Sequence, residues 1–337
     1  MAPVPSASHP LAAGALPLPE IYTRVSHHVP AMEWPALARD VAAIQDLKRA
    51  RRAVVLAHNY QAPEIFHTVA DIVGDSLALA REAARTDAQV IVLAGVHFMA
   101  ETAKLLSPDK TVLIPDLRAG CSLAESITAA DVRALRARHP GVPVVTYVNT
   151  SAAVKAESDL CCTSGNARAV VASLKAPRVL LIPDQSLARN VQAEIPEVEI
   201  LTWAGHCEVH ARFTPQDVRE VREAYPGVTV LAHPECPPEV VAEADFAGST
   251  AMMQDFVETR RPARVALITE CAMADNLAQR NPDIAFVRPC NLCPHMKRIT
   301  LPAIRRALET MTHEVSVPRD LAGPARRAVA RMLAVTP

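Results

Sequence analysis

The sequence lacks three features, and each absence excludes a class of protein. Net charge is nearly absent, since 35 basic side chains stand against 36 acidic ones, so no overall field attracts nucleic acid or an anionic membrane surface. No apolar run approaches the ~20 residues that a membrane-spanning helix needs. The first 30 residues, rich in Pro, Ala and Ser, lack a basic segment followed by an apolar one. We interpret them as a loosely ordered extension rather than a signal peptide.

The eight cysteines are interpreted with these absences in mind. Without an export signal we expect a cytoplasmic protein, whose cysteines are more often free thiols or metal ligands than a disulfide framework. We expect small-molecule substrates, and neither nucleic acid nor a membrane as partner. Four of the cysteines are predicted to be packing residues: Cys161, Cys162, Cys236 and Cys271.

One segment of the sequence occurs three times. Moving residues 230–250 back by 86 positions finds five identical residue types. Three polar positions align in the same shift: His233 with Tyr147, Glu235 with Asn149, and Thr250 with Ser164. Moving the segment back by 175 positions aligns residues 230–233 with the same four residue types at 55–58. Such a repeat predicts one structural unit built three times.

Apolar runs and helical segments alternate in each copy, which is typical of α/β units with parallel sheets. The predicted strands cover 53–57, 90–94, 111–114, 142–146, 179–182, 199–202, 228–231, 265–268 and 284–287. We expect three homologous three-layer αβα domains in pseudo-threefold arrangement, with the active site and any cluster at the central axis. Their predicted bounds are 37–128, 129–214 and 215–305, between a flexible extension over 1–36 and C-terminal helices over 306–337. Helical patterns at 297–311 and 325–333 are expected to pack on the last domain.

Polar side chains follow the first strand of each copy. Ligands bind beyond the carboxyl ends of strands in open α/β sheets, so these side chains are candidates for chemistry. They are His58, Asn59, Tyr60, Tyr147, Asn149, His233 and Glu235. A hydroxyl also begins a predicted helix in each copy, at Ser76, Ser164 and Thr250, where free amides favour an anion. Taken singly, each hydroxyl is more simply an ordinary N-cap.

Three cysteines repeat with the same period. Cys121, Cys207 and Cys293 are 86 residues apart, so pseudo-threefold symmetry would bring three thiols together near the axis. Three thiols suit a four-iron cluster with one open iron, which can act as a Lewis acid, whereas a structural zinc site fills four positions. Buried apolar cysteines are the alternative interpretation.

The neighbours of two of these cysteines carry further information. Ser122 and Glu125 are spaced as a capping box, which predicts that Cys121 lies at a helix N-terminus. Cys290 precedes Cys293 by three residues and leaves several roles open. It could be a fourth ligand, a redox partner of Cys293 or part of a zinc site.

Ten stretches carry a resemblance to a known family. They are AHNYQAPEI (57–65), GDSLALA (74–80), MAETAKLL (99–106), AGCSLAE (119–125), TYVNTSAAVKAESD (146–159), CTSGNA (162–167), GHCEVHARF (205–213), HPECPPEV (233–240), ADFAGST (244–250) and CPHMKRITL (293–301). On these stretches, in order over about residues 40–305, the chain resembles quinolinate synthase, the iron-sulfur enzyme family of NAD biosynthesis.

The resemblance implies a reaction and a cofactor. Members condense iminoaspartate (iminosuccinate) with dihydroxyacetone phosphate to quinolinate, releasing phosphate and two waters. The iminoaspartate would come from an aspartate-oxidising enzyme. A [4Fe-4S] cluster would be held by Cys121, Cys207 and Cys293, with its open iron facing the substrate. Cys293 rather than Cys290 matches the third ligand, because the family's ligand stands three residues before the methionine that is Met296 here.

The resemblance also implies roles for the polar residues. The implied substrate-binding residues are His58, Ser76, Tyr147, Val148, Asn149, Ser164, His233, Pro234, Glu235 and Thr250. Glu235 and Tyr147 would serve acid–base steps, since a dehydrating cyclisation moves several protons. His58 and Tyr60 would aid isomerisation and closure of the triose, and His233 is also implied to be catalytic. Ser164, Thr250 and nearby helix N-termini would hold carboxylate and phosphate.

Two other function classes remain as alternatives. The thiols could hold a cluster for redox sensing without turnover, although a sensor has no need for this set of strand-end acids and bases. A triose-phosphate lyase or aldolase would require a Schiff-base lysine, and the strand-end sets contain none.

Overall fold

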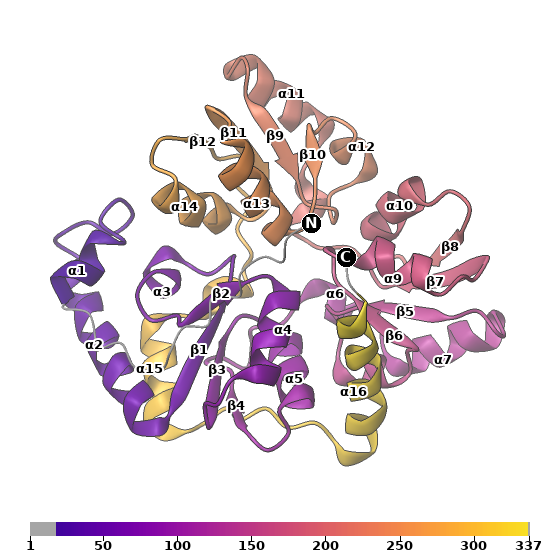
Figure 1. The fold of residues 1–337 in the computed structure, drawn as a ribbon, viewed down its shortest axis with the longest axis horizontal. Helices are drawn as coiled ribbons and strands as arrows, with labels where there is room; N and C mark the ends of the chain where they lie inside the picture. The colour runs from indigo at the N-terminus through magenta and orange to yellow at the C-terminus, as the bar shows by residue number, and fades with distance from the viewer. Residues whose placement is uncertain (1–17, 336–337) are drawn as a thin grey trace.

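The computed structural model describes residues 18–335, and Figure 1 shows three lobes around a common centre. Each lobe contains a four-stranded parallel sheet, with the order β2-β1-β3-β4, β6-β5-β7-β8 or β10-β9-β11-β12. Helices flank the sheets. The predicted α/β architecture of three αβα units is therefore confirmed.

The strands of the three sheets follow one another in chain order. The first sheet contains β1 (Ala53–His58), β2 (Ile72–Gly74), β3 (Val90–Ala94) and β4 (Thr111–Leu113). The second contains β5 (Val144–Tyr147), β6 (Leu160–Cys162), β7 (Arg178–Ile182) and β8 (Glu199–Thr202). The third contains β9 (Thr229–Ala232), β10 (Phe246–Ala247), β11 (Arg264–Ile268) and β12 (Ala285–Val287).

The helices fall into the same three groups, with additions at both ends. Up to the first thiol they are α1 (Leu18–Thr23), α2 (Trp34–Arg51), α3 (Pro63–Phe66), α4 (Ser76–Arg85) and α5 (His97–Leu106). The next group is α6 (Ser122–Glu125), α7 (Ala129–Arg138), α8 (Ala152–Ala156), α9 (Ala167–Ser173), α10 (Gln185–Glu194) and the 3₁₀ turn η1 (His210–Arg212). The last group is α11 (Pro215–Ala224), α12 (Pro238–Val241), α13 (Thr250–Arg260), α14 (Cys271–Arg280), the 3₁₀ turn η2 (Met296–Arg298), α15 (Leu301–Thr310) and α16 (Arg319–Ala334).

The central strands are apolar because helices cover both faces of each sheet. All six residues of β1 are buried, as are all five of β3. The edge strands β2, β6 and β10 were not predicted, since runs of two or three residues are too short to show a period. Their positions depend instead on pairing with β1, β5 and β9.

One polar contact recurs in all three units and supports the repeat. An aspartate just before each edge strand accepts the backbone amide of the neighbouring central strand: Val55 N to Asp71 Oδ2 at 2.8 Å, Val144 N to Asp159 Oδ2 at 2.7 Å, and Val230 N to Asp245 Oδ2 at 2.7 Å. A basic side chain from the preceding helix pairs with each aspartate: Lys48 at 2.6 Å, Arg136 at 2.8 Å and Arg222 at 3.0 Å.

The C-terminal helices pack differently from the expectation. Helix α15 begins at Leu301, because residues 296–298 form the separate turn η2. It packs against α2 and β3 of the first unit, and α16 packs against α8, β6 and α5 of the second and first units. The connection between them adds an antiparallel bridge from Glu314 to Leu113 at the edge of the first sheet. The prediction that these helices pack on the last domain was wrong, because apolar periodicity gives a buried face but not its partner.

Residues 18–36 also differ from the expected flexible extension. Helix α1 and the turns after it bury Ile21, Val25 and Val29, and the ring of Tyr22 lies 5.1 Å from that of Trp34. Ile21 and Trp34 join the hydrophobic core that contains the first sheet, and α1 packs on α2. The other part of the predicted extension, residues 1–17, lies outside the described residues.

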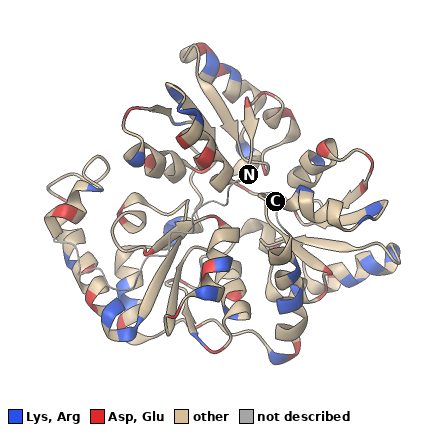
Figure 2. Ribbon diagram, in the orientation of Figure 1, with Lys and Arg blue, Asp and Glu red and all other residues tan. Residues whose placement is uncertain are grey.

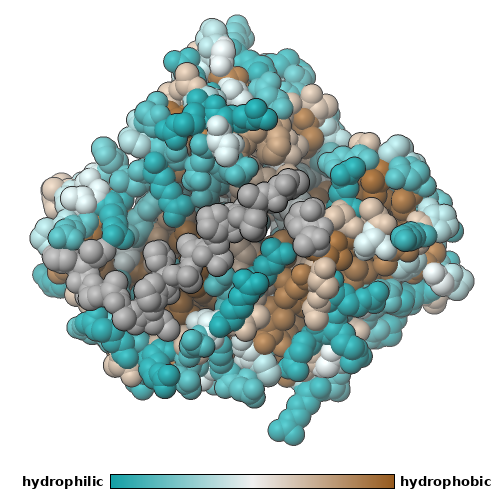
Figure 3. All heavy atoms as spheres, in the orientation of Figure 1, coloured by the Kyte–Doolittle hydropathy of each residue, from teal (hydrophilic) through white to brown (hydrophobic). Residues whose placement is uncertain are grey.

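Charge and hydropathy are distributed over the outside of the lobes. Figure 2 shows basic and acidic residues interspersed on the outer helices, while the centre of the view carries few of either. On the face in Figure 3, hydrophilic residues dominate the outer edges and apolar residues gather toward the centre. Within residues 18–335, none of the helices combines the length and apolarity that crossing a membrane requires.

Candidate active site

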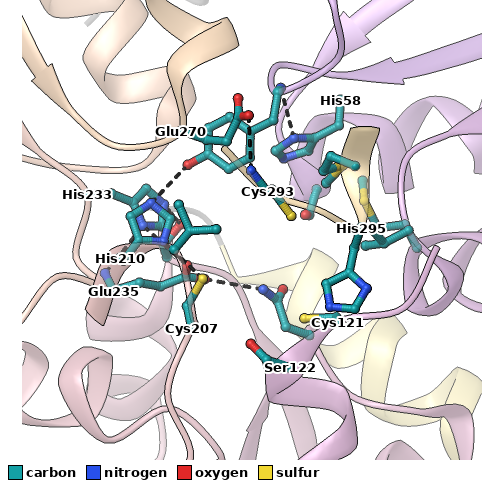
Figure 4. A pocket seen from close by; sticks show the side chains of 18 of the residues that line it. His58, Cys121, Ser122, Cys207, His210, His233, Glu235, Glu270, Cys293 and His295 are labelled. Atoms are coloured by element: carbon teal, nitrogen blue, oxygen red, sulfur yellow. Dashed lines mark hydrogen bonds and ion pairs between the residues drawn. The ribbon is translucent and has the colours of Figure 1, made fainter. Parts of the chain in front are cut away.

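A cavity lies where the three units meet, and its empty space, open solvent at the mouth included, is about 730 Å³. Side chains from all three units line it (Figure 4). Twelve of the predicted site residues are among them: His58, Tyr60, Ser76, Cys121, Tyr147, Asn149, Ser164, Cys207, His233, Glu235, Thr250 and Cys293. Val148 and Pro234 do not line it. Val148 borders a smaller void beside it, and the carbonyl of Pro234 accepts a hydrogen bond from Asn190 at 2.8 Å.

Two buried histidines stand at equivalent places after β1 and β9. Nδ1 of His58 accepts the amide of Tyr60 at 3.2 Å, and Nδ1 of His233 accepts the amide of Glu235 at 3.3 Å. Burial lowers the pKa of His58 to about 4 and that of His233 to about 3. Both rings are therefore neutral near pH 7, with the proton on Nε2. That proton can bond to Ser164, whose Oγ lies 3.2 Å from Nε2 of His233.

Glu235 is the centre of the polar network and is 4% exposed. Its Oε1 accepts the hydroxyl of Tyr147 at 2.6 Å and Nδ2 of Asn149 at 3.2 Å, while Oε2 lies 2.7 Å from Nδ1 of His210. Burial acts to raise the pKa of Glu235. The charge and hydrogen bond of His210 act in the opposite direction, as do His233 and Tyr147, and together they outweigh burial, so the pKa is lowered. The group is a carboxylate across the ordinary pH range.

Tyr60 reaches the same network from the first unit. Its hydroxyl lies 2.6 Å from Oγ1 of Thr269, which in turn lies 2.9 Å from Nε2 of His210. Burial, reinforced by the charge of Glu235, raises the pKa of Tyr60 well above its ordinary value, and the same two causes act on Tyr147. Both phenols therefore keep their protons and can donate them.

Sequence reasoning missed His210 and Thr269. His210 follows Cys207 by three residues, but the equivalent positions after the other two thiols are Ala124 and Met296, so the repeat gives no signal there. Thr269 stands at the end of β11, whereas the search for polar residues covered only the first strand of each unit. Extending that search to the second predicted strand of each unit, which is β11 in the third unit, would have found it.

The helix-head hydroxyls divide into two groups. The N-caps of α4 and α13 are Asp75 and Ser249, whose side chains accept helix amides, so the following Ser76 and Thr250 are not caps. Oγ1 of Thr250 accepts Nδ2 of Asn59 at 2.9 Å. Ser164 does not begin a helix, contrary to the prediction, because α9 starts at Ala167. Local turn chemistry at 163–166 shifts that helix start.

The structure also corrects the capping box near the first thiol. The N-cap of α6 is Cys121, and Ser122 is the first helical residue. The hydroxyl of Ser122 instead accepts the amide of Glu208 at 3.1 Å, which ties this turn to the loop after Cys207. The prediction that Cys121 lies at a helix N-terminus is confirmed.

Three thiols, Cys121, Cys207 and Cys293, line the cavity from three different units, and each is free. Burial raises the pKa of all three, that of Cys121 to about 12. The amides two and three residues further on act against burial at every sulfur: Leu123 and Ala124, Val209 and His210, His295 and Met296. Amides directed at sulfur stabilise thiolates, so this repeated arrangement fits three ligands of an iron-sulfur cluster.

The other cysteines divide differently from the prediction. Cys161, Cys162 and Cys236 are buried and free, as expected of packing residues. Cys271 instead forms a disulfide with Cys290, so neither is a packing residue or a free thiol. The prediction that Cys271 is a packing residue was wrong, and Cys290 takes a partner other than those considered for it, because sequence spacing does not show that the loop before Cys293 returns to the start of α14.

The comparisons with known proteins agree with one another. The family model described as "Quinolinate synthetase A protein" matches residues 42–334. Quinolinate synthase 2 of Mesorhizobium japonicum is 69% identical over 315 residues, covering 94% of this chain and 97% of the relative. The chain belongs to the quinolinate synthase family. Quinolinate synthase of Agrobacterium fabrum is 67% identical over 315 residues, covering 94% and 91% of the two chains. That of Xylella fastidiosa (strain Temecula1) is 69% identical over 296 residues, covering 88% and 87%.

Membership in the quinolinate synthase family makes the chain an enzyme of NAD biosynthesis, and the charge of its cavity restricts how it can bind anions. Among the described residues that line the cavity there is no lysine or arginine. The lining carboxyl groups are those of Asp75, Glu208, Glu235 and Glu270. Anionic groups in this cavity would therefore depend on neutral donors: hydroxyls, histidine N–H groups and backbone amides.

Proposed function

We propose that the chain condenses iminoaspartate with dihydroxyacetone phosphate, giving quinolinate, phosphate and two waters. The observation that carries the proposal is the joining of Glu235, Tyr147 and His210 within one cavity that also holds three free thiols. The relatives named quinolinate synthase support it. A redox sensor would have no use for a buried acid–base network of this kind.

We infer that Cys121, Cys207 and Cys293 hold a [4Fe-4S] cluster. The fit rests on three free thiols from three units and on the amides that point at each sulfur. When bound, a cluster with three cysteine ligands supplies an open iron, a Lewis acid for a hydroxyl or carbonyl oxygen. Cys290 is excluded as a ligand while it is bonded to Cys271.

The chain's own residues supply the proton transfers. The carboxylate of Glu235 can accept a proton, and the phenol of Tyr147, 2.6 Å away, can donate one. His210 lies between Glu235 and Thr269, so its two ring nitrogens can carry a proton toward Tyr60. We assign Glu235 and Tyr147 to the acid–base steps that remove water.

The turn after β1 serves the triose in this proposal. His58 is neutral and Tyr60 is protonated, so each offers a hydrogen-bond donor to a carbonyl or hydroxyl oxygen. His233 has the same neutral form in the third unit and orients Ser164. These side chains would guide isomerisation and ring closure without adding charge to the cavity.

The anionic groups of the substrates would bind at helix starts. Ser76 and Thr250 begin helices of 10 and 11 residues whose N-caps are separate side chains. The hydroxyl of Ser76 therefore remains available, and that of Thr250, whose oxygen accepts Nδ2 of Asn59, can still donate its proton. Ser164 and Asn149 complete the proposed substrate contacts, whereas Val148 and Pro234, which the resemblance also implied, do not line the cavity. Iminoaspartate would be supplied by an enzyme that oxidises aspartate.

Anaerobic purification tests the cluster and the reaction together. Iron and sulfide are counted, and quinolinate formation is measured from iminoaspartate and dihydroxyacetone phosphate. We expect about four irons per chain, and we expect Cys121→Ala, Cys207→Ala and Cys293→Ala each to lose both cluster and activity. Cys161→Ala, a buried packing position, is the matched control and should retain both. A parent chain that holds the cluster yet forms no quinolinate would contradict the proposed function.

A further inference from the structure

An ion pair between the buried Glu270, two residues past β11, and the half-buried Lys297 of η2 joins two parts of the site. Oε1 of Glu270 lies 2.8 Å from Nζ of Lys297 and accepts the amide of Cys293 at 3.3 Å. Nζ of Lys297 donates to the carbonyl of Tyr60 at 2.7 Å. The pair therefore connects the loop that carries the third thiol with the turn that carries Tyr60.

The burial of Glu270 makes its carboxylate depend on the partners around it. Glu270 is 1% exposed, and its other oxygen accepts the amide of Ala272 at 2.8 Å at the start of α14. The side chain of Lys297 is 26% exposed. A buried carboxylate must be offset by charge and hydrogen bonds, so removing Lys297 would leave Glu270 with amides alone.

The second unit shows that helix capping does not require such a lysine. Asp184 occupies the corresponding place after β7, caps α10 through Leu187 N at 3.0 Å, and forms the same kind of parallel bridge to the following loop as Glu270 does. Its second oxygen has no hydrogen-bond partner among residues 18–335, and burial raises its pKa well above the ordinary value. Lys297 is thus an addition particular to the third unit.

Thr269 and Glu270 together hold Tyr60 at two points. The hydroxyl of Thr269 lies 2.6 Å from the phenol oxygen, and the Glu270–Lys297 pair binds the backbone carbonyl. We propose that Glu270 and Lys297 are a positioning pair that fixes Tyr60 relative to Cys293. In this role the pair does not exchange protons with substrate. For its effect on catalysis, the inference rests on the proposed function.

Three variants test the pair, each compared with the parent chain after cluster loading. Lys297→Met leaves the buried carboxylate of Glu270 without its cation, which should displace Tyr60. Because a small displacement of a catalytic group slows the chemical step, we expect kcat per cluster-loaded chain to fall about 10- to 100-fold, with KM within about threefold of the parent. The double variant Glu270→Gln/Lys297→Met also removes the charge of the carboxylate. We therefore expect its kcat to be about fivefold or more above that of Lys297→Met. Lys297→Arg should remain within about threefold of the parent. Arg219→Met breaks the exposed pair with Glu243 in the same unit and is the matched control.

A second measurement does not depend on turnover. In the cluster-free chain, alkylation of Cys293 by iodoacetamide is followed by peptide mass, and we expect it to be several-fold faster in Lys297→Met and unchanged in Arg219→Met. If Lys297→Met does not accumulate, Glu270→Gln is measured in the same two ways. Unchanged kcat and unchanged alkylation would overturn the inference. An inactive parent with faster alkylation in the variant would overturn the proposed function and leave the positioning pair intact.

Discussion

The turns after β1 and β9 share one backbone arrangement but carry different chemistry. In both, a neutral histidine accepts the amide two residues on. In both, an asparagine from the α-helix of a neighbouring unit binds two carbonyls: Asn276 binds those of Asn59 and Gln61, and Asn190 binds those of Pro234 and Cys236. The residue two positions after the histidine is Tyr60 in the first turn and Glu235 in the second.

The difference shows how a repeated scaffold acquires an asymmetric site. The histidine and asparagine positions, where the copies agree, hold the backbone. The positions where they differ supply one phenol that keeps its proton and one carboxylate that lacks it. Both turns face one cavity, and the phenol and the carboxylate are joined across units through Thr269 and His210.

The largest expected effect comes from removing the charge of Glu235 in the turn after β9. Glu235→Gln keeps the shape but removes the base, and we expect kcat for quinolinate formation to fall about 10³-fold, within the range for general acid–base groups. The brown absorbance and iron content should stay at the parent level. Glu239→Gln, four residues further on and exposed, is the control and should be active. Activity of Glu235→Gln near that of the control would remove Glu235 from the mechanism.

The corresponding change in the first turn should have a smaller effect. Tyr60→Phe removes a phenol that bonds to Thr269 but leaves Glu235 and His210 in place, so we expect kcat to fall about 10- to 100-fold. Steady-state kinetics with each substrate varied in turn gives the measurement, and Tyr225→Phe on the exposed surface serves as the control. A loss equal to that of Glu235→Gln would mean that the two turns contribute alike.

The repeat made much of the fold and site predictable. Equal spacing identified the three thiols, and the strand-end search identified His58, Tyr147 and Glu235 before any geometry was known. His210 escaped it because the other copies have no polar residue at the equivalent position, and Thr269 escaped it because the search covered only the first strand of each unit. Symmetry in a sequence predicts the frame better than it predicts the departures from it.

Contacts between units were the least predictable feature. The partners of α15 and α16 and the Lys297 bond to Tyr60 join segments distant in sequence. The Cys271–Cys290 disulfide escaped prediction within one unit, although its cysteines are only 19 residues apart. Hydrophobic period and capping signals describe local structure, and a buried face can be satisfied by any complementary surface. The helix start expected at Ser164 failed for a local reason, since Asn166 rather than Ser164 is the N-cap of α9.

The two histidines also predict how stability depends on pH. Because burial lowers the pKa of His58 to about 4, the neutral form is stabilised, and its contribution is full above the unfolded value of about 6.5. It is lost as pH falls toward 4, at about 1.4 kcal/mol per pH unit, or about 2 kcal/mol between pH 6.5 and 5. Urea unfolding of the cluster-free chain at several pH values gives the free energy of unfolding at each pH. A plot of this free energy against pH should have a shallower slope for His58→Gln than for the parent.

His233 sharpens this test because its pKa is lowered further, to about 3. His233→Gln should flatten the slope over the same interval and also below pH 4, where His58→Gln no longer differs from the parent in slope. His27→Gln, at an exposed position, is the control and should follow the parent throughout. Equal slopes for the parent and both buried-histidine variants would show that the turns are held by other groups.

The smallest effects are expected at the ion pair that recurs in all three units, between a basic helix residue and the aspartate just before the edge strand. Lys48 is 8% exposed and pairs with Asp71, whereas Arg222 and Asp245 are 35% and 43% exposed in the side chain. We expect Lys48→Met to cost about 2 kcal/mol of unfolding free energy, since its partner is left partly buried, and Arg222→Met less than about 1 kcal/mol. Urea denaturation of cluster-free chain measures both. Equal costs would mean that burial does not distinguish these pairs and that each aspartate acts through its bond to the strand amide alone.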